Sequence, residues 1–268
     1  MRIAIDHRTR YRFSEPQARV VQLLRMTPQD SAHQTVVHWH IGVDCDARLR
    51  DTRDGFGNRV TMLYASGPLE GIEITVTGEV LTAEAHGMVD GAGEPLPPLL
   101  FLRATDRTRA DEGLAAFAHQ RATGSAIERL HRFNTALSAR FEIVVERHDA
   151  GRTAREAFGD ATASSRDLAH LFIAGVRSLG VPARYVTGYR PVEHGHAPTP
   201  HAWAEAYVEA LGWVAFDPSR GCSADETYVR VAIGPDAATC APVAGSRLGP
   251  GNEALDVDLQ VAAVRDGA

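Results

Sequence analysis

The sequence predicts an α+β protein in which an antiparallel β-sandwich is followed by a domain of mixed helices and strands. Two observations support this fold class. Over residues 1–81, apolar side chains alternate with polar or small ones at a period of two, which is typical of strands with one buried face. After residue 98 the spacing becomes that of amphipathic helices, and strands return from residue 183. Several strands without intervening helices favour a sandwich.

The two regions are separated by a segment with the composition of a linker. Residues 82–98 are rich in glycine and proline, at Gly87, Gly91, Gly93, Pro95, Pro97 and Pro98. We therefore expect three parts: a β-sandwich over residues 1–81, a linker over 82–98 and the mixed domain over 99–268. The mixed domain ends in a strand pattern formed by Leu255, Val257, Leu259 and Val261.

Three helix starts stand out in the second region. Ser125 is placed to cap one helix, and Thr153 with Glu156 has the spacing of a capping box. A third helix begins near Ser164 and Ser165 and carries an apolar stripe made of Leu168, Leu171, Phe172, Gly175, Val176 and Leu179. A glycine and a proline follow that stripe and supply its stop signal.

Bulk composition excludes several function classes. The 268 residues are 44% hydrophobic and 23% charged, and a net charge of −6 provides no basic field for nucleic acid or an anionic membrane surface. No apolar run approaches the ~18 residues of a membrane helix, and the amino terminus lacks the apolar stretch of a secretory signal. Cys45, Cys222 and Cys240 have no metal-ligand spacing. We expect a cytoplasmic protein with reduced thiols.

The pair Ser164-Ser165 could carry chemistry, because it stands at the start of the third helix. A helix start gathers unpaired backbone N–H groups and a partial positive charge, which stabilise an anion or a developing oxyanion. A nucleophile there would gain from both effects. The simpler interpretation is a helix cap, since Asp167 follows Ser164 by three residues, and spacing alone favours the cap.

His201 and Asp217 form the second candidate feature. Alternation over residues 201–208 places His201 on one face with Trp203, while alanines take the other face. If this strand forms a hairpin with residues 213–217, and the loop has an odd number of residues, His201 and Asp217 lie on the same face within contact distance. The pair would then be an imidazole oriented by a carboxylate, as in the base and orienter of a catalytic triad.

Two other histidine arrangements compete with this pair. His170 is nearer to Ser165 in sequence, but five helical residues turn the two side chains about 140° apart. We therefore expect His170 to be a buried structural residue, bonded to Asp167 three residues before it. His194 and His196, with His201, could suggest a metal site, yet no cysteine or acidic residue apart from Glu193 stands at ligand spacing, so we expect a loop without metal.

The order of these motifs resembles the bacterial transglutaminase-like superfamily. The opening of the chain, residues 6–13 through 56–58, is similar to the β-rich N-terminal region that precedes this domain in bacterial members. The resemblance covers nearly the whole chain, and its further matching segments are Ser165-Arg-Asp-Leu-Ala-His170-Leu, residues 179–189, His201-Ala-Trp203-Ala-Glu-Ala-Tyr207, Gly212-Trp-Val-Ala-Phe-Asp217-Pro218, residues 228–234 and residues 241–245. It implies a papain-like fold and a Cys-His-Asp triad, with Ser165 in the nucleophile position, His201 as base and Asp217 as orienter.

The sequence departs from the family at position 165, where the family has cysteine and this chain has serine. A cysteine beside a histidine can rest as a thiolate, with a thiol pKa as low as ~3–4, whereas a serine must lose its proton as it attacks. Three explanations stay open. Ser165 is a native nucleophile, or it replaces the family cysteine for study, or the chain is a non-catalytic relative.

The resemblance implies acyl transfer or hydrolysis at a peptide or protein amide carbonyl. The reaction would pass through an acyl-enzyme, and its acceptor would be an amine or water. The alternative is a catalytically inactive relative that acts as a peptide-binding or assembly module. Neither function requires a metal or an organic cofactor, and neither involves a nucleic acid or a membrane.

Overall fold

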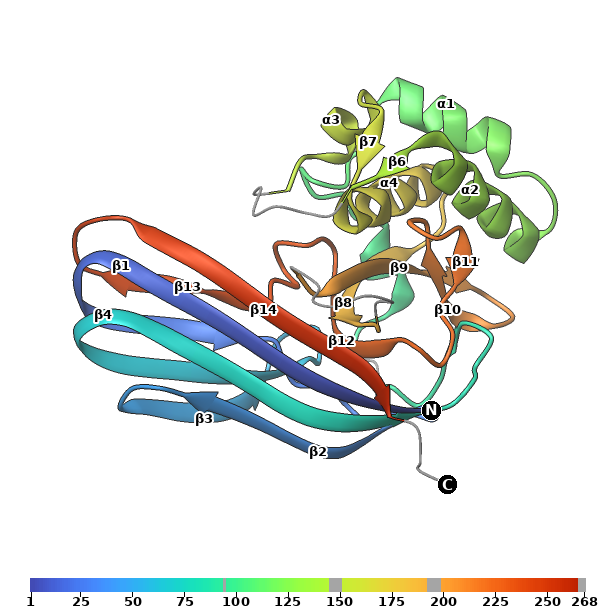
Figure 1. The fold of residues 1–268 in the computed structure, drawn as a ribbon. Helices are drawn as coiled ribbons and strands as arrows, with labels where there is room; N and C mark the ends of the chain where they lie inside the picture. Colours follow the sequence, from blue (N-terminus) through green and yellow to red (C-terminus); the bar gives the residue numbers. More distant parts are fainter. Residues whose placement is uncertain (94, 145–150, 192–198, 265–268) are drawn as a thin grey trace.

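The computed structural model describes residues 1–93, 95–144, 151–191 and 199–264 (Figure 1). Two six-stranded antiparallel sheets dominate these residues, and helices gather on one of them. The predicted α+β fold class is confirmed. None of the helices within the described ranges is both long and apolar enough to cross a membrane.

The N-terminal region is a single sheet that folds over into two layers. Its two long strands, β1 (Arg2–Leu24) and β4 (Arg59–Thr82), pair in both layers, and register shifts over residues 12–19 of β1 mark the bend. In one layer they are flanked by β14 (Glu253–Val264) and β2 (Gln34–Val43), and in the other by β13 (Val243–Leu248) and β3 (Ala47–Arg53). The space between the layers is filled by Val20, Leu24, Leu63, Ile72, Ile74 and Val76.

The sandwich includes the last two strands of the chain, so the expected division at residues 99–268 is wrong at its C-terminal end. β13 and β14 both pair with β1, and the register places Val261 opposite Ile5. The alternation of apolar residues over 255–261 correctly indicated a strand. It could not indicate the partner, because pairing between residues so far apart in sequence leaves no local pattern.

The core domain is built on the second sheet, whose strand order is β11-β10-β9-β8-β12. The long strands are β8 (Ala183–Tyr189), β9 (His201–Val208), β10 (Gly212–Asp217) and β12 (Val229–Gly234), and β11 (Cys222–Ser223) is short. Helix α4 (Ser165–Ser178) packs on β8 and β9, and around it lie α1 (Glu112–Arg121), α2 (Ala126–Arg140) and α3 (Ala154–Phe158). A parallel pair, β6 (Glu142–Ile143) and β7 (Thr162–Ala163), lies beside α4.

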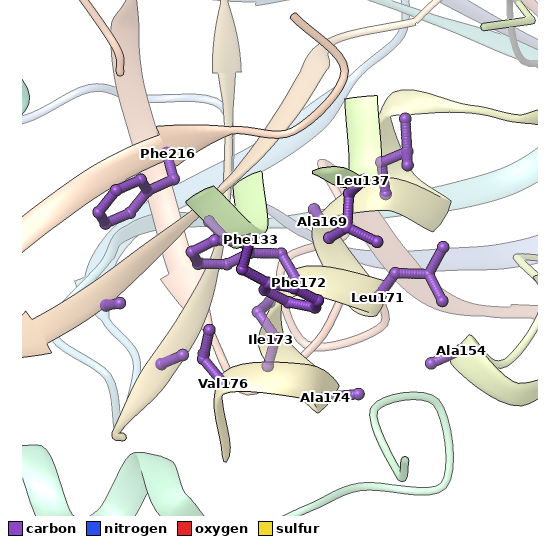
Figure 2. Close-up of a cluster of buried hydrophobic side chains, with 14 of the residues drawn as sticks. Phe133, Leu137, Ala154, Ala169, Leu171, Phe172, Ile173, Ala174, Val176 and Phe216 are labelled. Carbon is purple, nitrogen blue, oxygen red and sulfur yellow. The ribbon is translucent and has the colours of Figure 1, made fainter. Parts of the chain in front are cut away.

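The core of this domain forms where α4 meets the sheet. Phe172 stacks against Phe133 of α2 and against Phe216 of β10, with ring centroids 5.8 and 5.1 Å apart, and Figure 2 shows the three rings grouped in this core. The alanines of β9 (Ala202, Ala204 and Ala206) pack under the same helix. Small side chains on this face of β9 allow the helix to approach the sheet closely. Because successive side chains of a strand alternate, Trp203 points to the opposite face.

The segment expected to be a linker is partly built into the core domain. β5 (Met88–Val89) adds to the edge of β10, with Val89 opposite Trp213. The 3-10 helix η1 (Pro98–Leu102) then places Phe101 edge-on against Trp213, with ring centroids 5.4 Å apart. Described parts of the glycine- and proline-rich stretch therefore belong to the core domain and do not form a separate linker.

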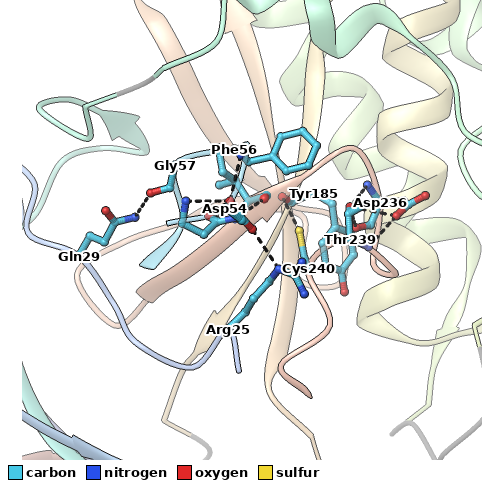
Figure 3. A network of polar contacts seen from close by, with 11 residues as sticks. Arg25, Gln29, Asp54, Phe56, Gly57, Tyr185, Asp236, Thr239 and Cys240 are labelled. Atoms are coloured by element: carbon cyan, nitrogen blue, oxygen red, sulfur yellow. Dashed lines mark hydrogen bonds and ion pairs between the residues drawn. The ribbon is translucent and has the colours of Figure 1, made fainter. Parts of the chain in front are cut away.

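Side-chain amides join the sandwich to the edge of the core sheet. The Asn58 amide donates to the Ile233 carbonyl and accepts from its N–H, each at 2.8 Å, and Gln34 pairs with the Arg230 backbone in the same way. Asp54 holds Asn58 in place and also accepts from Arg25 at 3.0 Å (Figure 3). These contacts satisfy backbone groups of β12 that an edge strand would otherwise leave unpaired.

Candidate active site

Helix α4 begins with a division of roles between the two serines. Ser164 is the N-cap, and its hydroxyl accepts a hydrogen bond from the Asp167 N–H at 3.2 Å. The Asp167 carboxylate in return accepts from the N–H and the hydroxyl of Ser164, at 3.1 and 2.9 Å. The capping interpretation is thus confirmed for Ser164 and Asp167. Ser165 takes no part in the cap and is the first residue of the helix, half-buried in its first turn.

His201 and Asp217 lie on adjacent antiparallel strands and are hydrogen-bonded. Between β9 and β10 the register places Val208 opposite Gly212, so that three residues, an odd number, form the loop. The side chains of His201 and Asp217 consequently share a face, as predicted for an odd loop. His201 Nε2 lies 2.6 Å from Asp217 Oδ2.

Asp217 is buried and fully hydrogen-bonded. Its Oδ2 accepts from His201 and from the Tyr228 phenol at 2.7 Å, and its Oδ1 accepts from the N–H and the hydroxyl of Ser219 at 2.9 and 2.6 Å. Burial alone would raise the pKa of this carboxyl, but these donors outweigh it and hold the pKa below its usual value. Asp217 is therefore an ionised acceptor at neutral pH.

The ionised carboxylate determines which ring nitrogen of His201 carries the hydrogen when the ring is neutral. Because Asp217 can only accept, Nε2 carries the hydrogen and Nδ1 is left as the basic nitrogen. The ring is also stacked near Trp203, with centroids 6.2 Å apart, and about a fifth of the side chain is exposed. An oriented imidazole with one free basic nitrogen can act as a general base.

Strand direction brings the three predicted positions to one end of the core domain. α4 runs from Ser165 to its C-terminus, β8 returns beside it, and the end of β8 pairs with the start of β9 through Gly188 and His201. β10 then returns to the same end, where it finishes at Asp217. The structure joins His201 to Asp217. Among the described residues no hydrogen bond joins the Ser165 hydroxyl to His201.

His170 is buried and structural, but its partner differs from the one expected. Its Nε2 accepts from the Ala237 N–H at 3.0 Å, and its Nδ1 has no partner among the described residues, so the expected bond to Asp167 is absent. Asp167 instead serves the helix cap and accepts from Arg152 at 2.8 Å. Burial lowers the pKa of His170 to about 4, which keeps the ring neutral.

The three cysteines do not supply an alternative nucleophile. Burial raises the pKa of each thiol, those of Cys45, Cys222 and Cys240. All three stay protonated near neutral pH and thus lack the thiolate that attacks a carbonyl. Within the described ranges, no group of three or more His, Cys, Asp or Glu side chains is arranged to hold a metal ion. His194 and His196 lie outside the described residues.

Sequence reasoning missed two residues that surround Asp217. Ser219 follows it by two positions, and an aspartate that accepts from a residue two further along is a known turn signal. That signal was available in the sequence. Tyr228 lies eleven residues away, and its phenol reaches Asp217 only because the chain turns back through β11. No local sequence pattern predicts such a contact.

The fold and the site together define a papain-like, transglutaminase-like protein. Residues 115–218 match the transglutaminase-like superfamily, and residues 3–81 match the bacterial transglutaminase-like N-terminal region. Residues 115–218 thus carry a transglutaminase-like core, and the region found before this core in bacterial members precedes it here. The resemblance found in the sequence is thus confirmed.

Relatives extend over almost the full chain. ML0607, an uncharacterized protein of Mycobacterium leprae, is 26% identical over 97% of this chain and 98% of its own length. Rv2569c, an uncharacterized protein of Mycobacterium tuberculosis, is 24% identical over 97% of this chain and 92% of its own length. A solved structure from Cytophaga hutchinsonii, described as a candidate cysteine protease, is 20% identical with a TM-score of 0.79, covering 100% of this chain and 92% of its own. That likeness shows a shared fold.

Proposed function

We propose that the core domain holds a site for acyl transfer or hydrolysis at a peptide or protein amide carbonyl. In this proposal residue 165 is the nucleophile position, His201 the general base and Asp217 the residue that orients it. The observation that supports it most is the 2.6 Å hydrogen bond between His201 and the buried, ionised Asp217. A buried carboxylate that four donors keep ionised beside a histidine is typical of a functional site.

The proposed reaction follows from these positions. The side chain of residue 165 attacks the amide carbon and passes its proton to Nδ1 of His201, while Asp217 stabilises the resulting imidazolium. The oxyanion of the tetrahedral intermediate would be stabilised by backbone N–H groups at the start of α4. His201 then gives its proton to the departing amine. Water or an acceptor amine attacks the acyl-enzyme, again through His201, and restores residue 165.

Serine at position 165 makes the nature of the nucleophile the central issue. A helix start and a neighbouring histidine stabilise a thiolate, but a serine hydroxyl does not ionise near neutral pH. A site shaped for sulfur would also hold the smaller oxygen too far from the carbon, and a displacement of about 1 Å can cost ~10²-fold in rate. We therefore favour a site built for thiol chemistry, in which Ser165 occupies the cysteine position.

A second candidate function is a catalytically inactive module that binds peptides or assembles other proteins. Two observations favour it: the serine itself, and the lack of a hydrogen bond between Ser165 and His201 among the described residues. Catalytic hydrogen bonds are often long before substrate binds, so the second observation fits both candidates. An experiment on position 165 separates them.

The test is the reactivity of a cysteine placed at position 165. If the site is built for a thiol, Ser165→Cys should react with iodoacetamide near neutral pH at least tenfold faster than a cysteine of ordinary pKa, ~8.5. The matched control is Ser178→Cys, at the exposed C-terminal end of the same helix, where the helix dipole disfavours a thiolate. The three native thiols have raised pKa values and should therefore be alkylated slowly. Mass spectrometry identifies which cysteine carries the label.

Two further measurements complete the test. Adding His201→Ala to Ser165→Cys should remove the excess reactivity, and Ser165→Cys alone should release amine or peptide from an amide substrate. Equal alkylation of Cys at 165 and at 178, with no amide turnover, would support the inactive module. A serine-directed phosphonate that labels Ser165 of the unmodified chain would show instead that the serine is a native nucleophile.

We also propose a cytoplasmic location, supported by three free cysteines, Cys45, Cys222 and Cys240. Cell fractionation checks it. Recovery of the chain outside the cytoplasmic fraction would contradict the proposal.

A further inference from the structure

A cavity of about 660 Å³ lies between the sandwich and the core domain. This interdomain cleft is bordered by β1 and β14 on the sandwich side, and by β8, the start of α4 and the residues before β9 on the core side. Its volume falls within the ~300–1,000 Å³ typical of ligand sites. Most of its lining side chains are uncharged.

The sandwich wall of the cleft continues a face that is buried elsewhere. β1 and β14 pair with Thr9 opposite Val257 and Tyr11 opposite Leu255, and all four residues border the cleft. Earlier on the same face of β1, Ile5 is buried against the core domain together with its partner Val261. One continuous sheet face therefore packs against the core domain at Ile5 and Val261 and lines the cleft further along β1 and β14.

The core wall reaches the end of the domain where the catalytic positions lie. Arg166 borders the cleft and directly follows Ser165, and Pro200 borders it and directly precedes His201. Tyr185 and Thr187 of β8 also border the cleft, as does the segment after β12, through Ala237 and Ala241. A molecule bound in the cleft would therefore extend toward the proposed site.

The edge of β14 faces the cleft. Glu253, Ala254 and Leu255 all border it, although consecutive strand residues point to opposite faces, so the cleft meets the edge of the strand as well as one face. In the part of the chain that the structure describes, β14 pairs only with β1. An edge strand offers backbone N–H and C=O groups to an extended chain, which can add to the sheet.

We propose that the interdomain cleft binds an extended, unfolded polypeptide segment, which adds as a strand to β14. Uncharged side chains of that segment would pack against Tyr11, Leu255 and Tyr185. The inference rests on the proposed function, because the bound segment would lead its amide group to residue 165. The substrate class would be unfolded polypeptide, because a folded surface cannot enter a cleft of this volume and pair with the strand edge.

The probe for this proposal is fluorescein-labelled ribonuclease A, reduced and carboxymethylated so that it stays unfolded, with native ribonuclease A as the folded control. Fluorescence anisotropy at 0.15 M salt (about an 8 Å screening length) limits non-specific attraction. The unmodified chain should bind the unfolded probe saturably and the native probe at least tenfold more weakly. Leu255→Trp fills the cleft and should weaken binding of the unfolded probe at least tenfold.

The matched control is Leu248→Trp, because Leu248 is an exposed leucine of β13 that does not border the cleft. It should leave the affinity unchanged. Leu255→Glu, which adds a charge without bulk, should weaken binding as well and guards against misfolding of the tryptophan variant. The proposal is overturned by the absence of saturable binding, by equal affinity for both probes, or by unchanged binding in both Leu255 variants.

Failure of this inference can be distinguished from failure of the proposed function. Iodoacetamide is small and does not require the cleft, so fast alkylation of Ser165→Cys can persist when the unfolded probe does not bind. That outcome overturns the cleft and keeps the catalytic site. Saturable binding with slow alkylation supports the cleft and contradicts the catalytic site.

Discussion

The phenolic oxygen of Tyr228 lies 2.7 Å from Oδ2 of Asp217, the same oxygen that accepts the hydrogen bond from His201. The tyrosine is buried, and its ring lies edge-on to Trp203, with centroids 5.3 Å apart. Burial raises the pKa of Tyr228 above its ordinary value, as does the adjacent Asp217 carboxylate. The phenol is therefore a permanent donor, and it helps to hold the carboxylate that orients the proposed base.

Tyr228→Phe should destabilise the protein by about 1.5–3 kcal/mol at pH 7, the range for hydrogen bonds to charged groups. The direction in which stability changes with pH is set by Asp217. Its pKa is depressed in the folded state, so its stabilisation is present above the unfolded value of ~3.9 and is lost as the pH falls through the folded value. Without Tyr228 that pKa rises, and acid unfolding should begin at higher pH. Urea unfolding between pH 3 and 7 measures both effects.

Tyr64→Phe is the control for that experiment, because Tyr64 is exposed on β4 and remote from the core sheet. Its stability should match that of the unmodified chain within about 0.5 kcal/mol. A Tyr228→Phe variant as stable as this control at every pH would show that the phenol contributes nothing to Asp217.

Buried His7 should make stability fall in mildly acidic solution. Its ring contacts Tyr189 and Thr9 at 3.1 and 3.2 Å, and burial lowers its pKa to about 4 from 6.5. Between pH 6.5 and pH 4 the unfolded chain binds a proton at this residue that the folded chain does not. Stability should decline through that window by up to about 3 kcal/mol from His7.

His7→Gln should flatten this dependence by about one proton, or 1.4 kcal/mol per pH unit. Exposed His40 provides the control, and His40→Gln should leave the slope unchanged. Unfolding free energies at half-unit pH steps give the slope. An unchanged slope in His7→Gln would mean that His7 takes up its proton in the folded state.

Glu205 should be among the most sensitive charged residues in the core sheet. Its carboxylate is fully buried and accepts from Arg184 at 2.6 Å and from Arg230 at 2.8 Å. Burial alone would raise the pKa of Glu205, but the two guanidinium groups lower it to about 2. Glu205→Gln leaves buried Arg184 without its charge partner and should cost about 3–5 kcal/mol.

Thermal and urea unfolding provide the measurement, and Glu209→Gln is the control because Glu209 is exposed after the end of the same strand. The control should change stability by less than about 0.5 kcal/mol. A loss below about 1 kcal/mol in Glu205→Gln would indicate that Arg184 finds another partner or shifts toward water.

Gly175 on α4 tests how closely α2 and α4 pack. A Cβ atom built there would lie 2.4 Å from Cζ of Phe133, a ring held against Phe172. Alanine would gain about 1 kcal/mol in helix propensity, yet overpacking of this kind costs about 1–3 kcal/mol. Gly175→Ala should therefore lower the unfolding free energy. Gly159→Ala is the control, since its Cβ would meet only a carbonyl at 3.5 Å, and a more stable Gly175→Ala would contradict the packing described.

The parts that sequence alone could predict are those with local causes. The cap formed by Ser164 and Asp167 depends on residues three apart, and the alternation of β9 separates Trp203 from the alanines under α4. The pairing of His201 with Asp217 needed one additional fact, the odd number of loop residues. The pairing register of β9 and β10 leaves three residues in the loop, and the prediction that His201 and Asp217 share a face depended on this odd number.

The parts that sequence could not predict depend on contacts between distant segments. Tyr228 reaches Asp217 through a turn of the chain, and His170 pairs with the Ala237 backbone 67 residues away. The partner of Arg184 lies on the neighbouring strand, at Glu205. Each contact is set by tertiary packing, which overrides local preference and leaves no periodic signal.

The return of β13 and β14 to the sandwich makes the core domain an insertion within the sequence of the first domain. Arg2 pairs with Val264, so the β1 edge of one sandwich layer is covered only once β14 has been synthesised. The core domain between them has its own apolar centre, and its helices make contacts that are short in sequence, which favours fast folding. The order of synthesis and the order of assembly therefore differ: β1 must wait for β14, and a growing chain exposes the edge of β1 until β14 has been made.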